Sequence, residues 1–140
     1  MPSVYQGPVR VLVVDDDDLL REALCEMLND QGFLVVGRAA SGHEGVELTM
    51  AYRPDVVLID FRMPGMDGFE ATSRIKAELP MTQSVVFTAY DDRTLTSEAT
   101  RAGVYCLLVK GCRPQLVVDM LRQAAMRKWE QETAPTVDPR

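Results

Sequence analysis

The chain has 140 residues, of which 46% are hydrophobic and 26% are charged, a composition typical of one globular domain with its own core. Its formal net charge of −6 at pH 7 disfavours phosphate backbones and anionic membranes, so we expect no direct nucleic-acid binding by this segment. Three cysteines without a CxxC pair argue against a disulfide framework or a zinc site. The sequence shows neither the pattern of a signal peptide nor an apolar run long enough to span a membrane, so we expect a cytoplasmic location.

Short apolar runs alternate with longer amphipathic segments from one end of the chain to the other. Gly32 is a helix stop, Ser41 followed by Glu44 is a capping-box pattern, and Pro114 suits the first position of a helix. The predicted strands are residues 9–14, 33–37, 55–60, 84–88 and 104–109. The predicted helices are residues 18–31, 41–52, 69–79, 92–102 and 114–129.

Five nearly continuous apolar strands that alternate with helices predict an α/β fold with a doubly wound parallel sheet, because strands buried on both faces lose the in-out alternation. We expect residues 1–8 to be an N-terminal extension and residues 9–130 to be the domain. Residues 131–140 are polar and contain two prolines, so we interpret them as a linker toward an output domain absent from this chain.

Polar side chains directly follow the predicted strands. Asp15 and Asp16 follow the first strand, Asp60 ends the third, Thr88 ends the fourth and Lys110 follows the fifth. Because ligands of open parallel sheets bind beyond the carboxyl ends of the strands, we expect these side chains to meet. Three carboxylates suit a hard cation such as Mg²⁺, and with the ammonium and the hydroxyl they predict a phosphoryl-transfer site.

The motifs at these strand ends resemble the receiver domain of two-component response regulators. The resemblance extends over residues 9–128 and rests on VLVVDDD, VVLIDFRMPGMDG, VVFTAY, AGV followed by LLVKG, and Pro114. Gly111 directly follows Lys110. A glycine at this position resembles the LuxR/NarL-type branch of the family. The resemblance implies a flavodoxin-like sheet with strand order 2-1-3-4-5 between five helices.

The resemblance also implies a role for each residue of the site. Asp60 would accept a phosphoryl group from a histidine kinase, Lys110 would pair with the carboxylate and then with the phosphoryl oxygens, and Thr88 would hydrogen-bond the phosphoryl group and bias the surface beyond it. The implied Mg²⁺ ligands are the carboxylates of Asp15, Asp16 and Asp60 and the backbone carbonyl of Arg62.

The same resemblance implies a signalling module that phosphorylates and dephosphorylates itself and is not an enzyme acting on an external substrate. Its implied partners are a cognate histidine kinase and its own output domain, a helix-turn-helix DNA-binding domain, and homodimerisation is a further expectation. The sequence departs from the family at Leu107, where many receivers have an aromatic residue; Tyr105 is expected on the same strand face. Arg62 and Tyr90 occupy positions that tune phosphoryl lifetime in the family.

Two further interpretations concern the run of four aspartates. We assign Asp17 and Asp18 to the start of the following helix, because aspartates cap free helix amides and favour the positive end of a helix. The alternative function is a haloacid dehalogenase-like phosphatase with Asp15 as nucleophile and Asp17 as acid-base. Leu19 departs from that family's pattern, and the two functions differ in whether Asp15 or Asp60 is phosphorylated.

Overall fold

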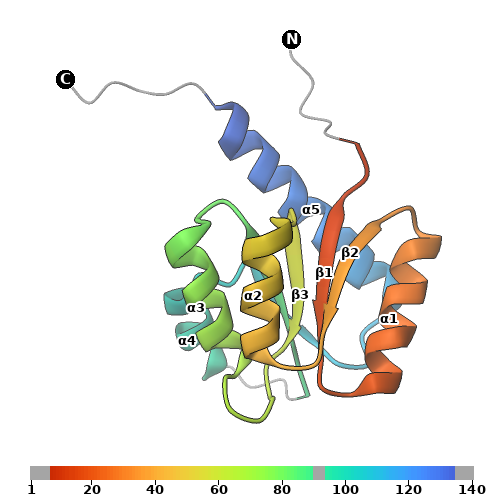
Figure 1. The fold of residues 1–140 in the computed structure, drawn as a ribbon, viewed down its shortest axis with the longest axis vertical. Helices are drawn as coiled ribbons and strands as arrows, with labels where there is room; N and C mark the ends of the chain where they lie inside the picture. The colour runs from red at the N-terminus through yellow and green to blue at the C-terminus, as the bar shows by residue number, and fades with distance from the viewer. Residues whose placement is uncertain (1–6, 90–93, 135–140) are drawn as a thin grey trace.

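A computed structural model describes residues 7–89 and 94–134, which form one five-stranded parallel sheet in the order β2-β1-β3-β4-β5. Helices cover both faces of the sheet (Figure 1), so the predicted fold class and strand order are confirmed. The strands are β1 (Arg10–Val14), β2 (Leu34–Ala39), β3 (Val56–Asp60), β4 (Gln83–Thr88) and β5 (Cys106–Val109). The helices are α1 (Asp18–Asp30), α2 (Gly42–Tyr52), α3 (Gly68–Glu78), α4 (Leu95–Ala102) and α5 (Pro114–Thr133).

Alternate residues of the central strands supply two separate hydrophobic cores, one on each face of the sheet. One core joins the sheet to α1 and α5 and includes Val13, Leu58, Phe87, Leu28 and Leu121. The other joins it to α2, α3 and α4 and includes Val14, Ile59, Val86, Phe69 and Ile75. Every residue of β3 and β4 is buried, which explains why these strands read as continuous apolar runs.

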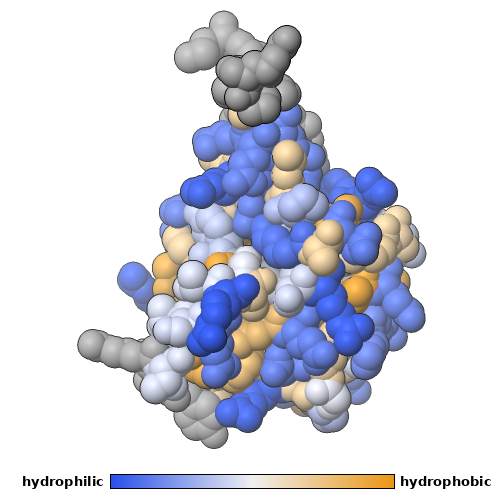
Figure 2. All heavy atoms as spheres, turned by 90° about the vertical axis from the view of Figure 1, so that its left-hand side faces the viewer, coloured by the Kyte–Doolittle hydropathy of each residue, from blue (hydrophilic) through white to orange (hydrophobic). Residues whose placement is uncertain are grey.

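The side of the molecule that carries α3 and α4 is mostly hydrophilic, with smaller hydrophobic patches between the polar side chains (Figure 2). Among the described residues, no helix has the length and apolar character needed to cross a bilayer.

Local hydrogen bonds explain where the first two helices begin. The Asp17 carboxylate accepts the backbone N–H of Leu20 at 3.1 Å, which confirms the capping role predicted for this aspartate. The Ser41 hydroxyl accepts the N–H of Glu44 at 3.1 Å, and the Glu44 carboxylate accepts the N–H of Ala40 at 3.0 Å. The capping box is therefore real, although Glu44 reaches the residue before the cap.

Several boundaries differ from the sequence prediction, and three of these differences bear on the rest of the structure. β5 begins at Cys106 and not at residue 104. The described part of the fourth helix begins at Leu95, and its predicted start lies in residues 90–93, outside the described residues. α5 continues to Thr133, so residues 131–133 of the predicted linker are helical. The Thr133 hydroxyl donates to the Trp129 carbonyl at 2.9 Å in this last turn.

The end of α5 is fastened to the base of the sheet by one carboxylate. Asp55, which precedes β3, is buried and accepts the Trp129 indole N–H at 3.1 Å and the Arg10 backbone N–H at 2.9 Å. The Lys128 ammonium lies 3.2 Å from the same carboxylate. Because these donors come from α5 and β1, Asp55 ties the helix to the strands whose carboxyl ends carry the polar residues.

We predict that Asp55→Ala lowers the free energy of unfolding by about 3 kcal/mol, because the Trp129 indole N–H and the Arg10 backbone N–H lose their buried acceptor and Lys128 keeps only Glu132 as a counterion. Urea unfolding followed by circular dichroism measures this change. Asp119→Ala is the matched control, since Asp119 is exposed on the same helix and bonds only Gln115; we expect a change below about 0.5 kcal/mol. Equal losses in the two variants would contradict this role of Asp55.

Candidate functional site

The sheet brings the five polar residues predicted at its strand ends, Asp15, Asp16, Asp60, Thr88 and Lys110, to one edge. Asp60 is the last residue of β3 and pairs with Phe87, the neighbour of Thr88. The backbone N–H of Lys110 donates to the Thr88 carbonyl at 2.8 Å, which places the ends of β4 and β5 side by side. Asp15 follows β1, which lies directly beside β3. The structure therefore confirms the predicted convergence at the carboxyl ends of the strands.

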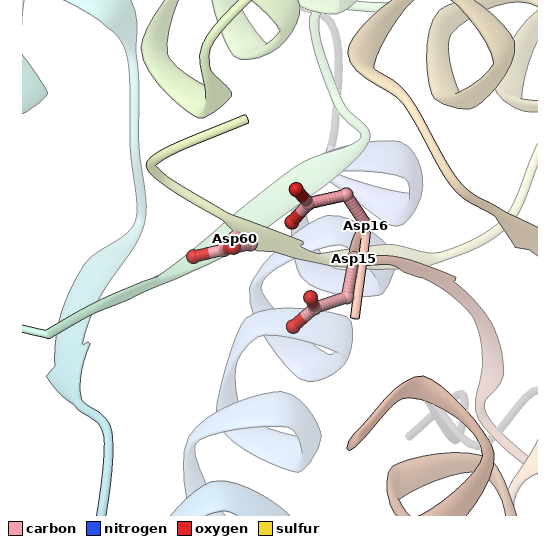
Figure 3. Close-up of side chains that lie close together, drawn as sticks. All are labelled: Asp15, Asp16 and Asp60. Carbon is pink, nitrogen blue, oxygen red and sulfur yellow. The ribbon is translucent and has the colours of Figure 1, made fainter. Parts of the chain in front are cut away.

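Three carboxylates meet at the centre of this edge. One oxygen each from Asp15, Asp16 and Asp60 lies within 4.8 Å of the others, and the three side chains extend from neighbouring strand ends toward the same side (Figure 3). Asp15 is 1% exposed and Asp60 is 4% exposed, whereas Asp16 is open to solvent. The cluster therefore has two buried members and one that faces water.

Lys110 is the cation nearest to the two buried carboxylates among the described residues. Its Nζ lies 3.0 Å from Oδ1 of Asp60 and 4.0 Å from Oδ2 of Asp15. One ammonium faces three carboxylates, so the site retains an excess of negative charge. Lys110 alone does not neutralise the cluster.

Burial raises the pKa of both Asp15 and Asp60 above the ordinary value of an aspartate. The backbone N–H of Asp17, which donates to Asp15 at 2.9 Å, opposes the rise in the pKa of Asp15. The hydrogen bond from Lys110 opposes the rise in the pKa of Asp60, and the Asp16 charge adds to it. In the absence of a further cation, the folded protein therefore resists the full ionisation of this cluster.

The donor set fits a magnesium ion. Oδ2 of Asp15 is buried and has no hydrogen-bond partner, and a buried carboxylate oxygen without a partner is costly unless a cation reaches it. All the donors are oxygens, which hard cations prefer. Asp15, Asp16 and Asp60 are thus suited to hold Mg²⁺, whereas the part played by the Arg62 backbone carbonyl stays a prediction.

Two residues that support the site were not singled out from the sequence. Arg21 of α1 donates to the Asp15 carbonyl at 2.8 Å and pairs with Asp18 at 2.8 Å, so it fixes the backbone beneath the acidic cluster. Gly68 packs so closely that a Cβ there would lie 2.7 Å from the Asp60 carbonyl oxygen. The i, i+3 spacing of Asp18 and Arg21 is a visible signal for the first, but the close approach at Gly68 is a tertiary contact.

Four further residues near the site were singled out from the sequence: Leu107, Tyr105, Arg62 and Tyr90. Leu107 packs against the core that includes α4, but Tyr105 packs against the core on the opposite face. The expectation that the two share a strand face is wrong, because Tyr105 precedes the first residue of β5. The Arg62 guanidinium lies 5.2 Å from the ring of Phe61, and Tyr90 lies outside the described residues.

Comparison with known proteins identifies the family. The sequence profile described as "Response regulator receiver domain" matches residues 11–122. The chain belongs to the response regulator receiver domain family. This receiver is 43% identical over 103 residues to the transcriptional regulatory protein PdtaR of Mycobacterium tuberculosis (strain H37Rv), a match that covers 74% of this chain and 50% of PdtaR. The chain spans about half the length of these curated transcriptional regulators.

Solved structures show the same fold as this receiver. The signal receiver domain of the putative response regulator NarL from Mycobacterium tuberculosis superposes with a TM-score of 0.80 at 35% identity, covering 85% of this chain and 97% of that one. A chain of the CheX-CheY-BeF3-Mg²⁺ complex from Borrelia burgdorferi matches with a TM-score of 0.78 at 25% identity, covering 84% of this chain and 89% of that one. The relationship to NarL confirms the predicted branch, and the phosphatase alternative finds no support.

We predict that Asp15→Asn raises the free energy of unfolding of the metal-free receiver at pH 7 by about 1 kcal/mol. The raised pKa of Asp15 means that the folded state binds the proton more tightly than the unfolded chain, so ionisation at neutral pH destabilises the fold. The gain should shrink as the pH falls through the raised pKa toward the ordinary value. Urea unfolding in a chelator at several pH values measures it, and a loss of stability at pH 7 would contradict this.

Proposed function

We propose that this receiver accepts a phosphoryl group on Asp60 and thereby controls the affinity of its surface for partners. The observation that carries the proposal is the position of the Asp60 carboxylate, buried 3.0 Å from the Lys110 ammonium and within 4.8 Å of the Asp15 and Asp16 carboxylates. A carboxylate held between positive charge and a metal-binding pair is placed to become an acyl phosphate.

In the proposed reaction, a carboxylate oxygen of Asp60 attacks the phosphorus of the donor, and the bond from phosphorus to the donor's leaving group breaks. Asp60 becomes an aspartyl phosphate, and the electron pair of the broken bond leaves with the donor. Mg²⁺ bound to Asp15, Asp16 and Asp60 would neutralise phosphoryl oxygens. Lys110, already 3.0 Å from Asp60, would then pair with the phosphoryl group.

Thr88 is proposed to convert phosphorylation into a change of shape. It is buried at the end of β4, between Asp60 on β3 and Lys110 after β5. In the proposed switch its hydroxyl donates to the phosphoryl group, which draws the following loop toward Asp60 and biases the surface of α4, β5 and α5. Leu107 occupies the position where many receivers have an aromatic residue, so the switch works here without an aromatic side chain at that place.

The proposed partners are a histidine kinase as phosphoryl donor and an output domain that binds DNA through a helix-turn-helix. The match to about half of a transcriptional regulatory protein supports an output domain that acts on transcription. Residues 134–140, which follow the end of α5 in the sequence, are proposed to lead toward it. Homodimerisation and a cytoplasmic location remain predictions.

The decisive prediction concerns the phosphorylated residue. Acetyl phosphate with Mg²⁺ should add one phosphoryl group to the receiver, and reduction by borohydride followed by peptide mass spectrometry should place it on Asp60. Asp60→Asn should abolish the label, because an amide is not a nucleophile toward phosphorus. A label on Asp15 would support the phosphatase alternative, and a receiver that takes no label from acetyl phosphate or a kinase would refute the proposal.

A second prediction separates the metal ligands from Asp18, the last residue of the same aspartate run. Asp15→Asn and Asp16→Asn should each weaken Mg²⁺ binding by about tenfold or more, since each removes a charged ligand. Asp18→Asn is the matched control, because Asp18 is exposed and pairs with Arg21. The Mg²⁺ affinity of this variant should stay within about twofold of the wild-type value. Isothermal titration calorimetry with Mg²⁺ measures this, and equal weakening in all three variants would contradict the assignment.

A further inference from the structure

A second polar hollow lies at the end of the sheet opposite to Asp60. It has a volume of about 360 Å³ and opens between α3, the starts of β4 and β5, and the last turns of α5. In Figure 1 this region lies toward the end of the molecule where α5 extends beyond the sheet. Its polar lining comprises Lys76, Gln83, Tyr105, Arg127 and Gln131. None of these residues belongs to the acidic site.

Lys76 is held in this hollow by neutral groups only. Its side chain is half-buried, and its stem packs so closely on Gly103 that a Cβ at that glycine would lie 3.0 Å from Cγ of Lys76. Its ammonium donates to the Pro80 carbonyl at 3.0 Å and to the side-chain oxygen of Gln83 at 3.3 Å. These contacts position the ammonium but leave its charge without a counterion.

Arg127 adds a second positive charge to the same hollow. Burial lowers the pKa of the Lys76 ammonium, and the Arg127 charge lowers it further. Within residues 7–89 and 94–134, neither Lys76 nor Arg127 forms an ion pair with a carboxylate within 4.0 Å. The next residue of the helix shows the contrast, because Lys128 lies 3.2 Å from Asp55 and 2.8 Å from Glu132.

Two cations that line one hollow, one of them half-buried, repel each other, and an anion bound between them would relieve this repulsion. The hollow also offers neutral hydrogen-bonding groups: Gln83 is buried and its amide nitrogen donates to the Gln131 side-chain oxygen at 3.4 Å. We propose that this hollow binds the phosphate group of a small-molecule ligand between Lys76 and Arg127.

The charge of the two cations favours phosphate over a carboxylate. A phosphate monoester carries nearly two negative charges at neutral pH and can neutralise both side chains, whereas a single carboxylate leaves one of them unpaired. Arginine binds phosphate through its planar fork of donors, and lysine binds it as a point charge. The volume of about 360 Å³ exceeds what a phosphate ion fills, which leaves space for an organic group beside Tyr105.

This proposal does not depend on phosphorylation of Asp60. The hollow lies at the start of β4 and β5, whereas Asp60 and Lys110 lie at the opposite ends of the strands. The receiver can therefore be tested without Mg²⁺ or a phosphoryl donor, and the Asp60→Asn variant should bind the ligand as the wild type does.

The test is a titration of the ¹⁵N-labelled, metal-free chain with inorganic phosphate at constant ionic strength, followed by NMR. We expect saturable shifts of the backbone amides of Gly103, Val104 and Tyr105. Lys76→Gln and Arg127→Gln should each weaken binding by about tenfold or more, since each removes a charge-assisted contact. Arg127 is exposed, so Arg127→Gln should fold and tests the proposal even if Lys76→Gln does not fold.

Arg101→Gln is the matched control, because it removes the same charge from an exposed position in the last turn of α4, outside the hollow. Its phosphate affinity should stay within about twofold of the wild type. Glycerol phosphate should bind at least as tightly as inorganic phosphate, and acetate should bind more weakly. The proposal is overturned if phosphate gives no saturable shifts at these amides, if Arg101→Gln and Arg127→Gln weaken binding equally, or if acetate matches phosphate.

Discussion

The repulsion between carboxylates at the ends of β1 and β3 is the constraint on which the rest of the site depends. Asp15 and Asp60 are almost completely buried, and Asp16 lies beside them. The parallel sheet forces them together because β1 and β3 are neighbours and end at the same edge. Hydrophobic packing on both faces of the sheet holds this arrangement. The favourable free energy of this packing thus offsets the repulsion between the carboxylates.

The same constraint explains the chemistry of the neighbouring residues. Lys110 is the one cation of the described residues that reaches the buried carboxylates, and it leaves the cluster acidic enough to attract a divalent ion. Arg21 and Gly68 fix the backbone from which Asp15 and Asp60 project. A site of this kind responds to phosphorylation because the added charge changes a balance that is already strained.

Much of this architecture was predictable from the sequence, because its signals are local. The apolar strands and the polar residue after each one determined the sheet and the position of the acidic cluster, and the cap of α1 followed from Asp17. The extension of α5 was missed since its last turn is polar and depends on the contact of Trp129 and Lys128 with Asp55, 74 residues from Trp129 along the chain.

The side of the strand occupied by Tyr105 was mispredicted for a similar reason. Alternation applies only within a strand, and the start of β5 at Cys106 is set by pairing with β4. The hollow around Lys76 was likewise invisible, because its residues come from α3, β4, the start of β5 and α5. Contacts between segments far apart in the chain carry no short-range pattern.

The attachment of α5 at Asp55 has a mechanical consequence. The helix has 20 residues, a rod of about 30 Å, and begins in the loop that follows Lys110. Its far end is anchored by Asp55 through Trp129 and Lys128. Between these two ends the helix is buried against the sheet through Val117, Leu121 and Ala124. A displacement of the loop near Lys110 would therefore move the helix as one rigid body, and whatever is joined to the chain after α5 would receive that movement as its signal.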